Sequence, residues 1–99
     1  MATRIEYEID TDIELQVPKK YKVILLNDNY STVEFVIQIL MQIFKKNLDE
    51  ATAITMNIHE NGKGICGIYT YEIAKTKSAQ VRESARKAEF PLKAIVEEE

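Results

Sequence analysis

The sequence contains very little cysteine and histidine, and each shortage excludes a class of protein. Cys66 is the only cysteine, so no intrachain disulfide can form, and a reducing compartment fits best. Together with the single His59 it cannot complete a structural zinc site, which needs four such ligands. No apolar run approaches the ~20 residues of a membrane span. The first residues, MATRIEYEIDTDIELQ, lack the apolar segment of a signal peptide. We expect a cytoplasmic protein that does not contact a membrane.

The features needed for catalysis are also missing. A nucleophile needs a base within hydrogen-bond reach, and Cys66 with His59 could be considered as such a pair. Cys66 lies within an apolar strand-like run, where a small buried thiol is the ordinary interpretation. The Asn/Asp-rich stretch after residue 26 lacks the spacing and the glycine of a calcium loop, and GKGICG lacks the ending of a phosphate loop. The sequence therefore predicts no enzyme and no cofactor.

Charge is divided unevenly along the chain, whose net charge is −3. Residues 1–17, the arm, carry about −4 by formal counting, which leaves the remainder mildly basic. The remainder has no dense Lys/Arg stripe with interleaved aromatics, so we expect no nucleic-acid partner. The alternation of Ile5, Tyr7 and Ile9 with acidic residues could form an edge strand. Its charge and its position before Pro18 favour a flexible arm ahead of a domain over 18–99.

The pattern of apolar residues and turn signals predicts six elements in the domain. Strands are expected at 21–26, 64–71 and 92–96. A first helix follows the S-x-x-E capping box of Ser31 and Glu34. A second begins near Asn47, with Glu50 at the capping-box position, and ends at Asn61-Gly62. A third extends from residue 70 or 71 to about 88. The order β-α-α-β-α-β predicts an α+β fold, a three-stranded antiparallel sheet packed against three helices.

Each helix has one apolar face, and we expect these faces to form the core. The residues expected to be buried are Val33, Val36, Ile37, Leu40, Met41 and Phe44 in the first helix, Leu48, Ala51, Ile54 and Ile58 in the second, and Ile73, Ala74, Val81 and Ala85 in the third. The residues expected largely outside are Lys75, Lys77, Arg82, Arg86 and Lys87.

One corner of the predicted fold is unusually polar. Asn27, Asp28 and Asn29 follow the first strand and precede the first helix. His59 lies near the end of the second helix, and a short turn makes these two helices roughly antiparallel, which can bring His59 back to the corner. Two interpretations remain at this point. These residues either make a turn and a helix cap, or form a binding site.

From about residue 18 to 97 the chain closely resembles the ClpS family of Clp protease adaptors. The resemblance is carried, in order, by YKVILLNDNYSTVEFVIQIL, ATAITMNIHENGKGICGIYTYEIAKTKSAQV and EFPL. It implies a small adaptor, expected to be a monomer, that binds proteins with destabilising bulky N-terminal residues (Phe, Leu, Tyr, Trp). It also implies delivery of these proteins to a Clp-type AAA+ unfoldase. The alternative is an interaction domain that modulates the substrate choice of the unfoldase without strong recognition of N-terminal residues.

The resemblance also implies roles for particular residues. Asn27, Asn29 and His59 would bind the α-amino group of the substrate. The pocket for its first side chain would be lined by Asp28, Ser31, Val33, Val36, Thr55, Ile58 and Leu92. Glu72 and Lys77 match positions that contact the N-terminal domain of the unfoldase, of the ClpA or ClpC class. The arm matches the variable extension that the family threads towards the unfoldase.

Three positions within residues 27–35 depart from the pattern of the family. Asn29 stands where the family usually has Asp, so it has no charge to set against an ammonium group. Val33 stands where the family usually has a Met that excludes β-branched side chains, and Thr32 replaces a frequent Pro beside it. From these changes we hypothesise weaker binding and a broader range of N-terminal residues.

Overall fold

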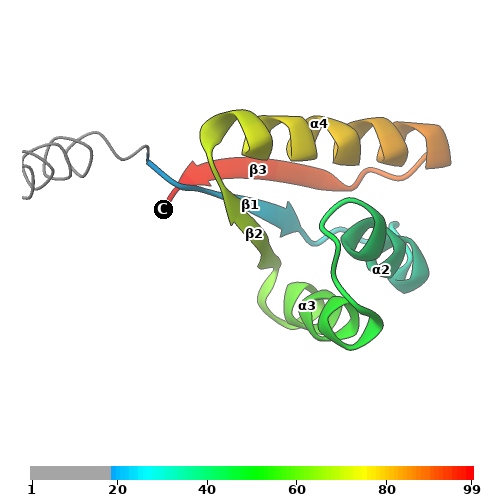
Figure 1. Cartoon of the computed structure of the whole chain (residues 1–99). Helices are drawn as coiled ribbons and strands as arrows, with labels where there is room; N and C mark the ends of the chain where they lie inside the picture. The colour runs from blue at the N-terminus through cyan, green and yellow to red at the C-terminus, as the bar shows by residue number, and fades with distance from the viewer. Residues whose placement is uncertain (1–18) are drawn as a thin grey trace, which may run out of the picture.

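The computed structural model describes residues 19–99, and its elements follow the predicted order. The expectations for the arm, and the boundary at Pro18, lie outside the described residues. The α+β class and the order β-α-α-β-α-β are confirmed (Figure 1). The elements are β1 (Tyr21–Leu26), α2 (Val33–Gln42), α3 (Leu48–Asn61), β2 (Lys63–Tyr69), α4 (Tyr71–Ala88) and β3 (Lys93–Glu98).

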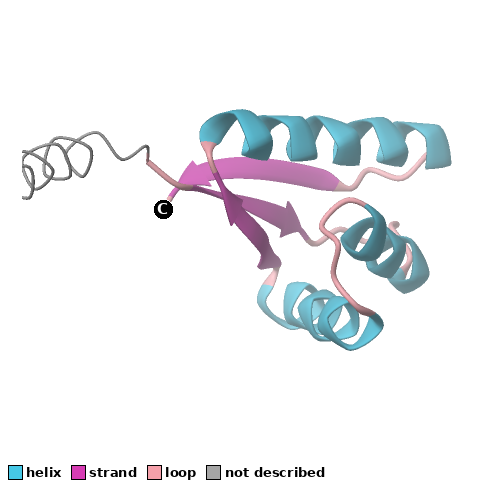
Figure 2. Ribbon diagram, in the orientation of Figure 1, coloured by secondary structure: helices cyan, strands magenta, loops and turns pink. Residues whose placement is uncertain are grey.

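The three strands form one antiparallel sheet in the order β2-β1-β3. Val23 and Leu25 of the central strand are fully buried and belong to the core cluster that all three helices share. In Figure 2, α4 lies along the sheet, whereas α2 and α3 lie together near the C-terminal end of β1. The corner that follows β1 therefore lies near α2 and α3.

Glycines in β2 allow close approach of the neighbouring elements. The pairing register shifts between Val23, which faces Gly67, and Ile24, which faces Ile65, so β2 carries a bulge. A Cβ atom on Gly64 would lie 2.7 Å from Ile58 Cγ1. The bare backbone of β2 thus lets α3 pack directly against the sheet.

Of the two expected capping boxes, only the one at α3 forms. The Asn47 side chain accepts from Glu50 N at 2.8 Å, and Glu50 Oε1 accepts from Asn47 N at 2.9 Å. At α2 the cap is Thr32, whose Oγ1 accepts from Phe35 N at 3.1 Å. The prediction of a cap at Ser31 is wrong because the Ser31 N–H already donates to Asp28 Oδ1 at 2.6 Å.

Several residues expected in the core lie at the surface instead. Ile73 is 48% exposed because its neighbour Ala74 takes the inward position, and adjacent helical residues point about 100° apart. The others are Val33, Met41 and Leu48. Lys77 was expected to be exposed, but it is half-buried.

Candidate functional site

The structure joins the polar corner to the end of α3. Asn27 N–H donates to the carbonyl of Gly62 at 2.9 Å. Gly62 ends α3 in the left-handed conformation (φ 87°), and His59 lies in the last turn of that helix. The side chains of Asn27, Asn29 and His59 are all exposed. The three residues expected to bind an amine are therefore placed on neighbouring segments with their side chains accessible.

Asp28 shapes the corner through its own backbone contacts. Its Oδ1 accepts from Tyr30 N at 2.7 Å and from Ser31 N at 2.6 Å. Burial alone would raise the pKa of Asp28, but hydrogen bonding with Ser31 and Tyr30 outweighs it and leaves the pKa below its ordinary value. Asp28 is thus a carboxylate near neutral pH, and it places one negative charge between Asn27 and Asn29.

Two oxygens at this corner are buried without a well-formed hydrogen bond among the described residues. They are Asp28 Oδ2 and Ser31 Oγ. The Ser31 hydroxyl nevertheless helps to lower the pKa of Asp28, so it lies near the carboxylate. Both atoms are shielded from solvent, so an outside donor does not reach them in this arrangement.

The residues expected to line the side-chain pocket divide into a buried group and an exposed one. Val36, Ile58 and Leu92 are buried and belong to one core cluster. Thr55 is also buried, and its hydroxyl donates to the Ala51 carbonyl at 2.7 Å, so it is already satisfied. Val33, by contrast, is 54% exposed. The three residues of the core cluster are the expected apolar floor of the pocket, and Val33 is its expected entrance.

A surface hollow of about 420 Å³ lies at the corner. Its lining residues are Leu26, Asn27, Asp28, Asn29, Tyr30, Pro91 and Lys93. Of the residues expected at the site, Asn27, Asp28 and Asn29 line the hollow. His59 and the residues of the apolar floor do not. Tyr30 and Lys93 were not expected here. Tyr30 directly follows the Asn-Asp-Asn run, but Lys93 reaches the hollow only through the pairing of β3 with β1.

The two residues matched to unfoldase contact lie in different environments on α4. Glu72 is exposed in the first turn, between Tyr71 and Ile73, which are also exposed. Lys77 instead donates from Nζ to the Ile43 carbonyl at 2.7 Å, and the same Nζ lies 5.8 Å from the centre of the Tyr69 ring. Glu72 is therefore free to meet a partner, whereas Lys77 already links α4 to the end of α2.

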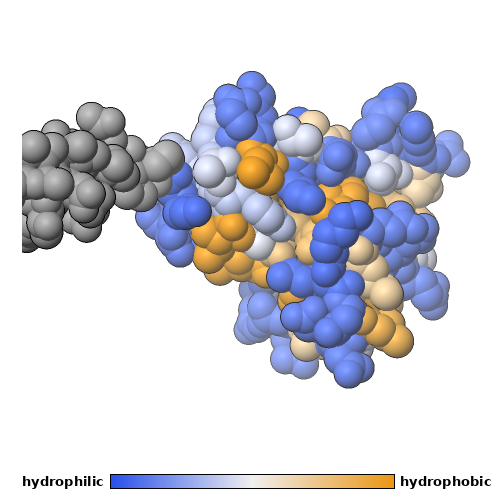
Figure 3. Space-filling view, viewed as in Figure 1, coloured by the Kyte–Doolittle hydropathy of each residue, from blue (hydrophilic) through white to orange (hydrophobic). Residues whose placement is uncertain are grey.

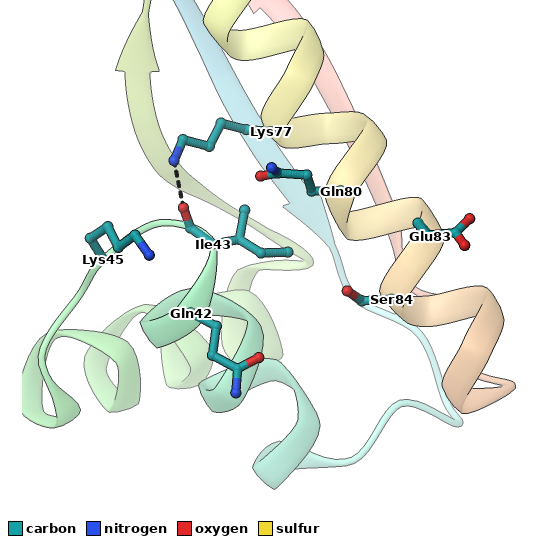
Figure 4. Close-up of a pocket in the computed structure, with 7 residues that line it drawn as sticks. All are labelled: Gln42, Ile43, Lys45, Lys77, Gln80, Glu83 and Ser84. Carbon is teal, nitrogen blue, oxygen red and sulfur yellow. Dashed lines mark hydrogen bonds between the residues drawn. The ribbon is translucent and has the colours of Figure 1, made fainter.

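Figure 4 shows the setting of Lys77, a hollow of about 380 Å³ between α2 and α4. Its lining residues are Gln42, Ile43, Lys45, Lys77, Gln80, Glu83 and Ser84. The ammonium group of Lys77 points to the carbonyl at the end of α2, where such carbonyls lack an intrahelical partner.

The Cys66–His59 pair considered from the sequence lies in two different environments. Cys66 is 1% exposed, and burial raises the pKa of its thiol to about 12. His59, the other half of the imagined dyad, is exposed on α3. Residues 19–99 contain no group of three or more His, Cys, Asp or Glu side chains that could hold a metal ion. None of the helices described over these residues combines the length and the apolar character that a membrane span requires.

A small α+β domain with a polar hollow at a strand end belongs, on this geometry, with binding modules. Comparison with known proteins gives the family. The model of the family described as ATP-dependent Clp protease adaptor protein ClpS matches residues 16–95. The chain therefore belongs to the ClpS family of adaptors of the ATP-dependent Clp protease, as its motifs predicted.

Individual relatives agree with this assignment over nearly the whole chain. The ATP-dependent Clp protease adapter protein ClpS of Wolinella succinogenes is 50% identical over 93 residues, which cover 94% of this chain and 91% of the relative. The ClpS of Campylobacter jejuni strain RM1221 is 57% identical over 86 residues, covering 87% and 90%. The structure of Agrobacterium tumefaciens ClpS2 bound to L-phenylalaninamide is similar with a TM-score of 0.81 and 35% identity, and the match covers 84% of this chain and all of that one.

Proposed function

We propose that this protein is an adaptor that binds substrate proteins by their N-terminal residue and delivers them to a Clp-type AAA+ unfoldase for degradation. The observation that carries the proposal is the joining of Asn27 to Gly62, which sets the corner beside the last turn of α3. The Agrobacterium relative binds L-phenylalaninamide, a molecule with a free α-amino group and a phenyl side chain. We expect this chain to take ligands of the same chemistry, with Phe, Leu, Tyr or Trp first.

The residues at the corner suit an α-ammonium group. The Asn27 and Asn29 carbonyls and a neutral His59 imidazole are acceptors, and the Asp28 carboxylate supplies a negative charge close by. Each hydrogen bond to a charged group contributes roughly 1.5–3 kcal/mol, and burial of one large apolar side chain contributes about as much. After the costs of association, binding in the micromolar range, about −8 kcal/mol, is a reasonable expectation.

The apolar floor and the open entrance account for the choice of side chain. Val36, Ile58 and Leu92 are buried in one core cluster and would form the apolar floor, and the hydroxyl of Thr55 is already satisfied. Val33 at the entrance is shorter than the Met usual in the family, so it leaves room for a branched Cβ. We therefore expect Ile-initiated substrates to be accepted more readily than by relatives with Met at this position.

Peptides that differ only in the first residue test the proposal. Fluorescence polarisation with Phe-, Leu-, Ile- and Ala-initiated peptides should show tight binding for Phe and Leu, weaker binding for Ile and little for Ala. Acetylation of the amine should abolish binding. The Val33→Met variant should reject Ile while it keeps Phe. A folded protein that binds none of these peptides would overturn the proposal.

Mutation of the end of α3 separates recognition from folding. His59→Ala should weaken binding of the Phe peptide without lowering the free energy of unfolding, because His59 is exposed. The adjacent exposed Glu60 offers a matched control, and Glu60→Ala should bind normally. Equal binding by both variants would remove His59 from the site.

A second function has one observation in its favour. Tyr71 and Ile73 are each 48% exposed and flank Glu72, so the first turn of α4 offers an apolar surface away from the corner. We propose that this surface contacts the N-terminal domain of an unfoldase of the ClpA or ClpC class. If the peptides do not bind while the unfoldase domain does, the protein only modulates the substrate choice of the unfoldase.

A further inference from the structure

The face of the sheet opposite the core carries its own apolar row. Ile24 lies between Val23 and Leu25, which belong to the core, so its side chain points to the other face. Ile65 of β2 and Ile95 of β3 pair with Ile24 across the sheet, and directly paired residues share a face. Ile24, Ile65 and Ile95 thus form a row across all three strands. We call this surface, with the rows on either side of it, the open face.

The open face leaves apolar side chains in contact with solvent. Ile65 is 49% exposed, and Ile68, in the neighbouring row beside Lys22, is 45% exposed. Ile24 is nearly fully buried yet lies outside the core cluster. Figure 3 shows hydrophobic surface over β2. An apolar patch on the uncovered face of a sheet is typical of an interaction surface.

Lysines surround this apolar row. Lys22 lies in the row before it, and Lys63 and Lys93 pair with Leu26 in the row after it. Glu97 is the one acidic residue in these rows. A hollow of about 270 Å³ opens on the same face. Its lining residues are Lys22, Ile24, Asn57, Asn61, Lys63, Gly64, Ile65 and Glu97. The open face therefore fits a partner that is apolar on one side and acidic on the other.

The sequence of the arm has this character over residues 5–17. Its odd positions are apolar except for Thr11, and its even positions are acidic except for Gln16. The apolar residues are Ile5, Tyr7, Ile9, Ile13, Leu15 and Val17, and the acidic ones are Glu6, Glu8, Asp10, Asp12 and Glu14. In an extended chain, alternate side chains point to opposite sides. Such a segment separates an apolar edge from an acidic one.

We propose that the open face is a docking surface for residues 5–17 of the same chain. The apolar edge of the arm would cover the isoleucine row, and the long side chains of the rim lysines would reach its carboxylates. Taken alone, the charge of the arm favours a free tail. The open face complements the arm, because its isoleucine row matches the apolar residues of the arm and its lysines match the acidic ones. The inference does not depend on the proposed function.

The attachment point of the arm makes this contact reachable. Lys19 Nζ lies 3.2 Å from Glu98 Oε1, and Glu99 N–H donates to the Lys20 carbonyl at 2.9 Å. The arm therefore joins the sheet at the end where β3 finishes, next to the first row of the open face. Thirteen extended residues reach up to about 43 Å, longer than a strand of six residues at about 20 Å. A short tether also gives an effective concentration in the millimolar range.

A spin label on the arm tests the proposal in the full chain. Cys66 is buried with a pKa of about 12, so a thiol introduced by Glu8→Cys is labelled selectively. Since tethering favours the docked arm, we expect about a two-fold or larger loss of amide signal at Ile65 and Ile68 relative to the label reduced with ascorbate. Signals at the exposed Arg86 of α4 should change little. Equal broadening at all exposed amides would overturn the proposal.

Charge substitutions on each side of the contact provide the decisive comparison. Ile65→Lys should abolish the selective broadening, whereas the equally exposed control Ile73→Lys on α4 should retain it. If Ile65→Lys fails to fold, Ile9→Lys tests the same contact from the arm, and unchanged broadening there would overturn the proposal.

A mixed sample distinguishes the chain's own arm from that of another molecule. Spin-labelled chain without ¹⁵N is combined with ¹⁵N chain without a label. We expect no loss of signal in this mixture. Broadening as strong as in the doubly labelled chain would overturn an intramolecular contact and assign the open face to a second copy.

Discussion

Asp28 couples the charge of the polar corner to its shape. Its carboxylate oxygen binds the N–H groups of Tyr30 and Ser31, and the pKa lies below its ordinary value. A carboxyl group whose pKa is lowered by folding stabilises the folded state above its unfolded pKa. This contribution is lost as the pH falls through the lower folded value. The stability of the fold and the negative charge that the corner offers to a ligand should therefore both depend on Asp28.

Replacement of Asp28 by Asn tests this coupling. The amide keeps one acceptor oxygen but no charge, so we expect Asp28→Asn to lower the free energy of unfolding by about 1 kcal/mol near neutral pH. The difference in free energy of unfolding between the variant and the unmodified protein should shrink below about pH 4, where Asp28 of the unmodified protein becomes protonated. Urea unfolding at pH 7 and pH 3 measures both values. An equal difference at the two pH values would contradict the role of the charge.

At Asn29 the expected change is in affinity rather than stability. The side chain is exposed in the corner hollow, so Asn29→Asp adds a carboxylate beside the proposed ammonium site. Charge-assisted hydrogen bonds are about twice as strong as neutral ones, so affinity for a Phe-initiated peptide should rise about fivefold. The gain should diminish at high salt.

The same substitution elsewhere controls for the change in net charge. Asn47 caps α3 through its side-chain oxygen, and Asp serves equally well at that position. Asn47→Asp should therefore leave both folding and peptide affinity unchanged. If Asn29→Asp also leaves affinity unchanged, then Asp28 already supplies the charge or Asn29 does not contact the amine.

The residues of the corner could be predicted from the sequence, but their local hydrogen bonds could not. Asn27, Asp28 and Asn29 stood out because no helix or strand pattern explained them. The capping box at Ser31 matched its motif and still failed, because Asp28 competes for the same N–H. A motif describes one pairing and does not account for rival acceptors nearby.

Between elements, the contact from Lys77 ties α4 to the end of α2. Its Nζ donates to the Ile43 carbonyl, so Lys77→Met should lower the free energy of unfolding by about 1–2 kcal/mol. Lys75→Met, on the exposed side of the same helix, should have little effect. Chemical denaturation of both variants measures the difference, and equal stability would show that the contact contributes nothing.

The same pair of helices bears on the proposed unfoldase contact. Glu72→Ala should weaken binding of the unfoldase N-terminal domain without loss of stability, because Glu72 is exposed. Lys77→Met should affect stability whatever it does to binding. A substitution at Lys77 therefore cannot by itself identify a contact surface, and Glu72 is the informative position.

Close approach of β2 and α3 sets the floor of the proposed pocket. Gly64→Ala would place a Cβ 2.7 Å from Ile58 Cγ1, and Ile58 is buried. The overpacking should destabilise the fold by about 1–3 kcal/mol and weaken binding of the Phe peptide, because Ile58 precedes His59. Thermal unfolding and peptide titration measure the two effects. Normal values for both would show that the β2–α3 contact is adaptable.

The order of elements could be predicted because apolar spacing and turn residues act locally. Exposure was harder to predict. Ile73 and Ala74 are adjacent and only one could face the core, and the packing of α4 selected the smaller residue. Val33 and Leu48 lie at the first positions of their helices, where no partner covers them. These outcomes depend on how whole elements meet, which no single helical pattern contains.

In the molecule as a whole, one cluster of buried side chains connects the sheet with all three helices. Cys66 lies within it and its thiol, with a pKa of about 12, stays protonated while the protein is folded. In the unfolded chain the thiol ionises at about pH 8.5. An acid whose pKa is raised by folding destabilises the folded state once the pH exceeds the unfolded value, because only the unfolded chain then releases its proton.

The free energy of unfolding should therefore decline above about pH 8.5, by up to about 1.4 kcal/mol per pH unit from this one group. Cys66→Ala removes the thiol, so its stability is lower near neutral pH but should decline less steeply as the pH rises. Guanidinium unfolding between pH 7 and pH 10 compares the two slopes.

The thiol of Cys66 should also react with a disulfide reagent only after the core opens, since it is buried and protonated. Fast labelling of the native protein, or identical slopes for the two proteins, would show that the single core opens near β2 without unfolding as a unit.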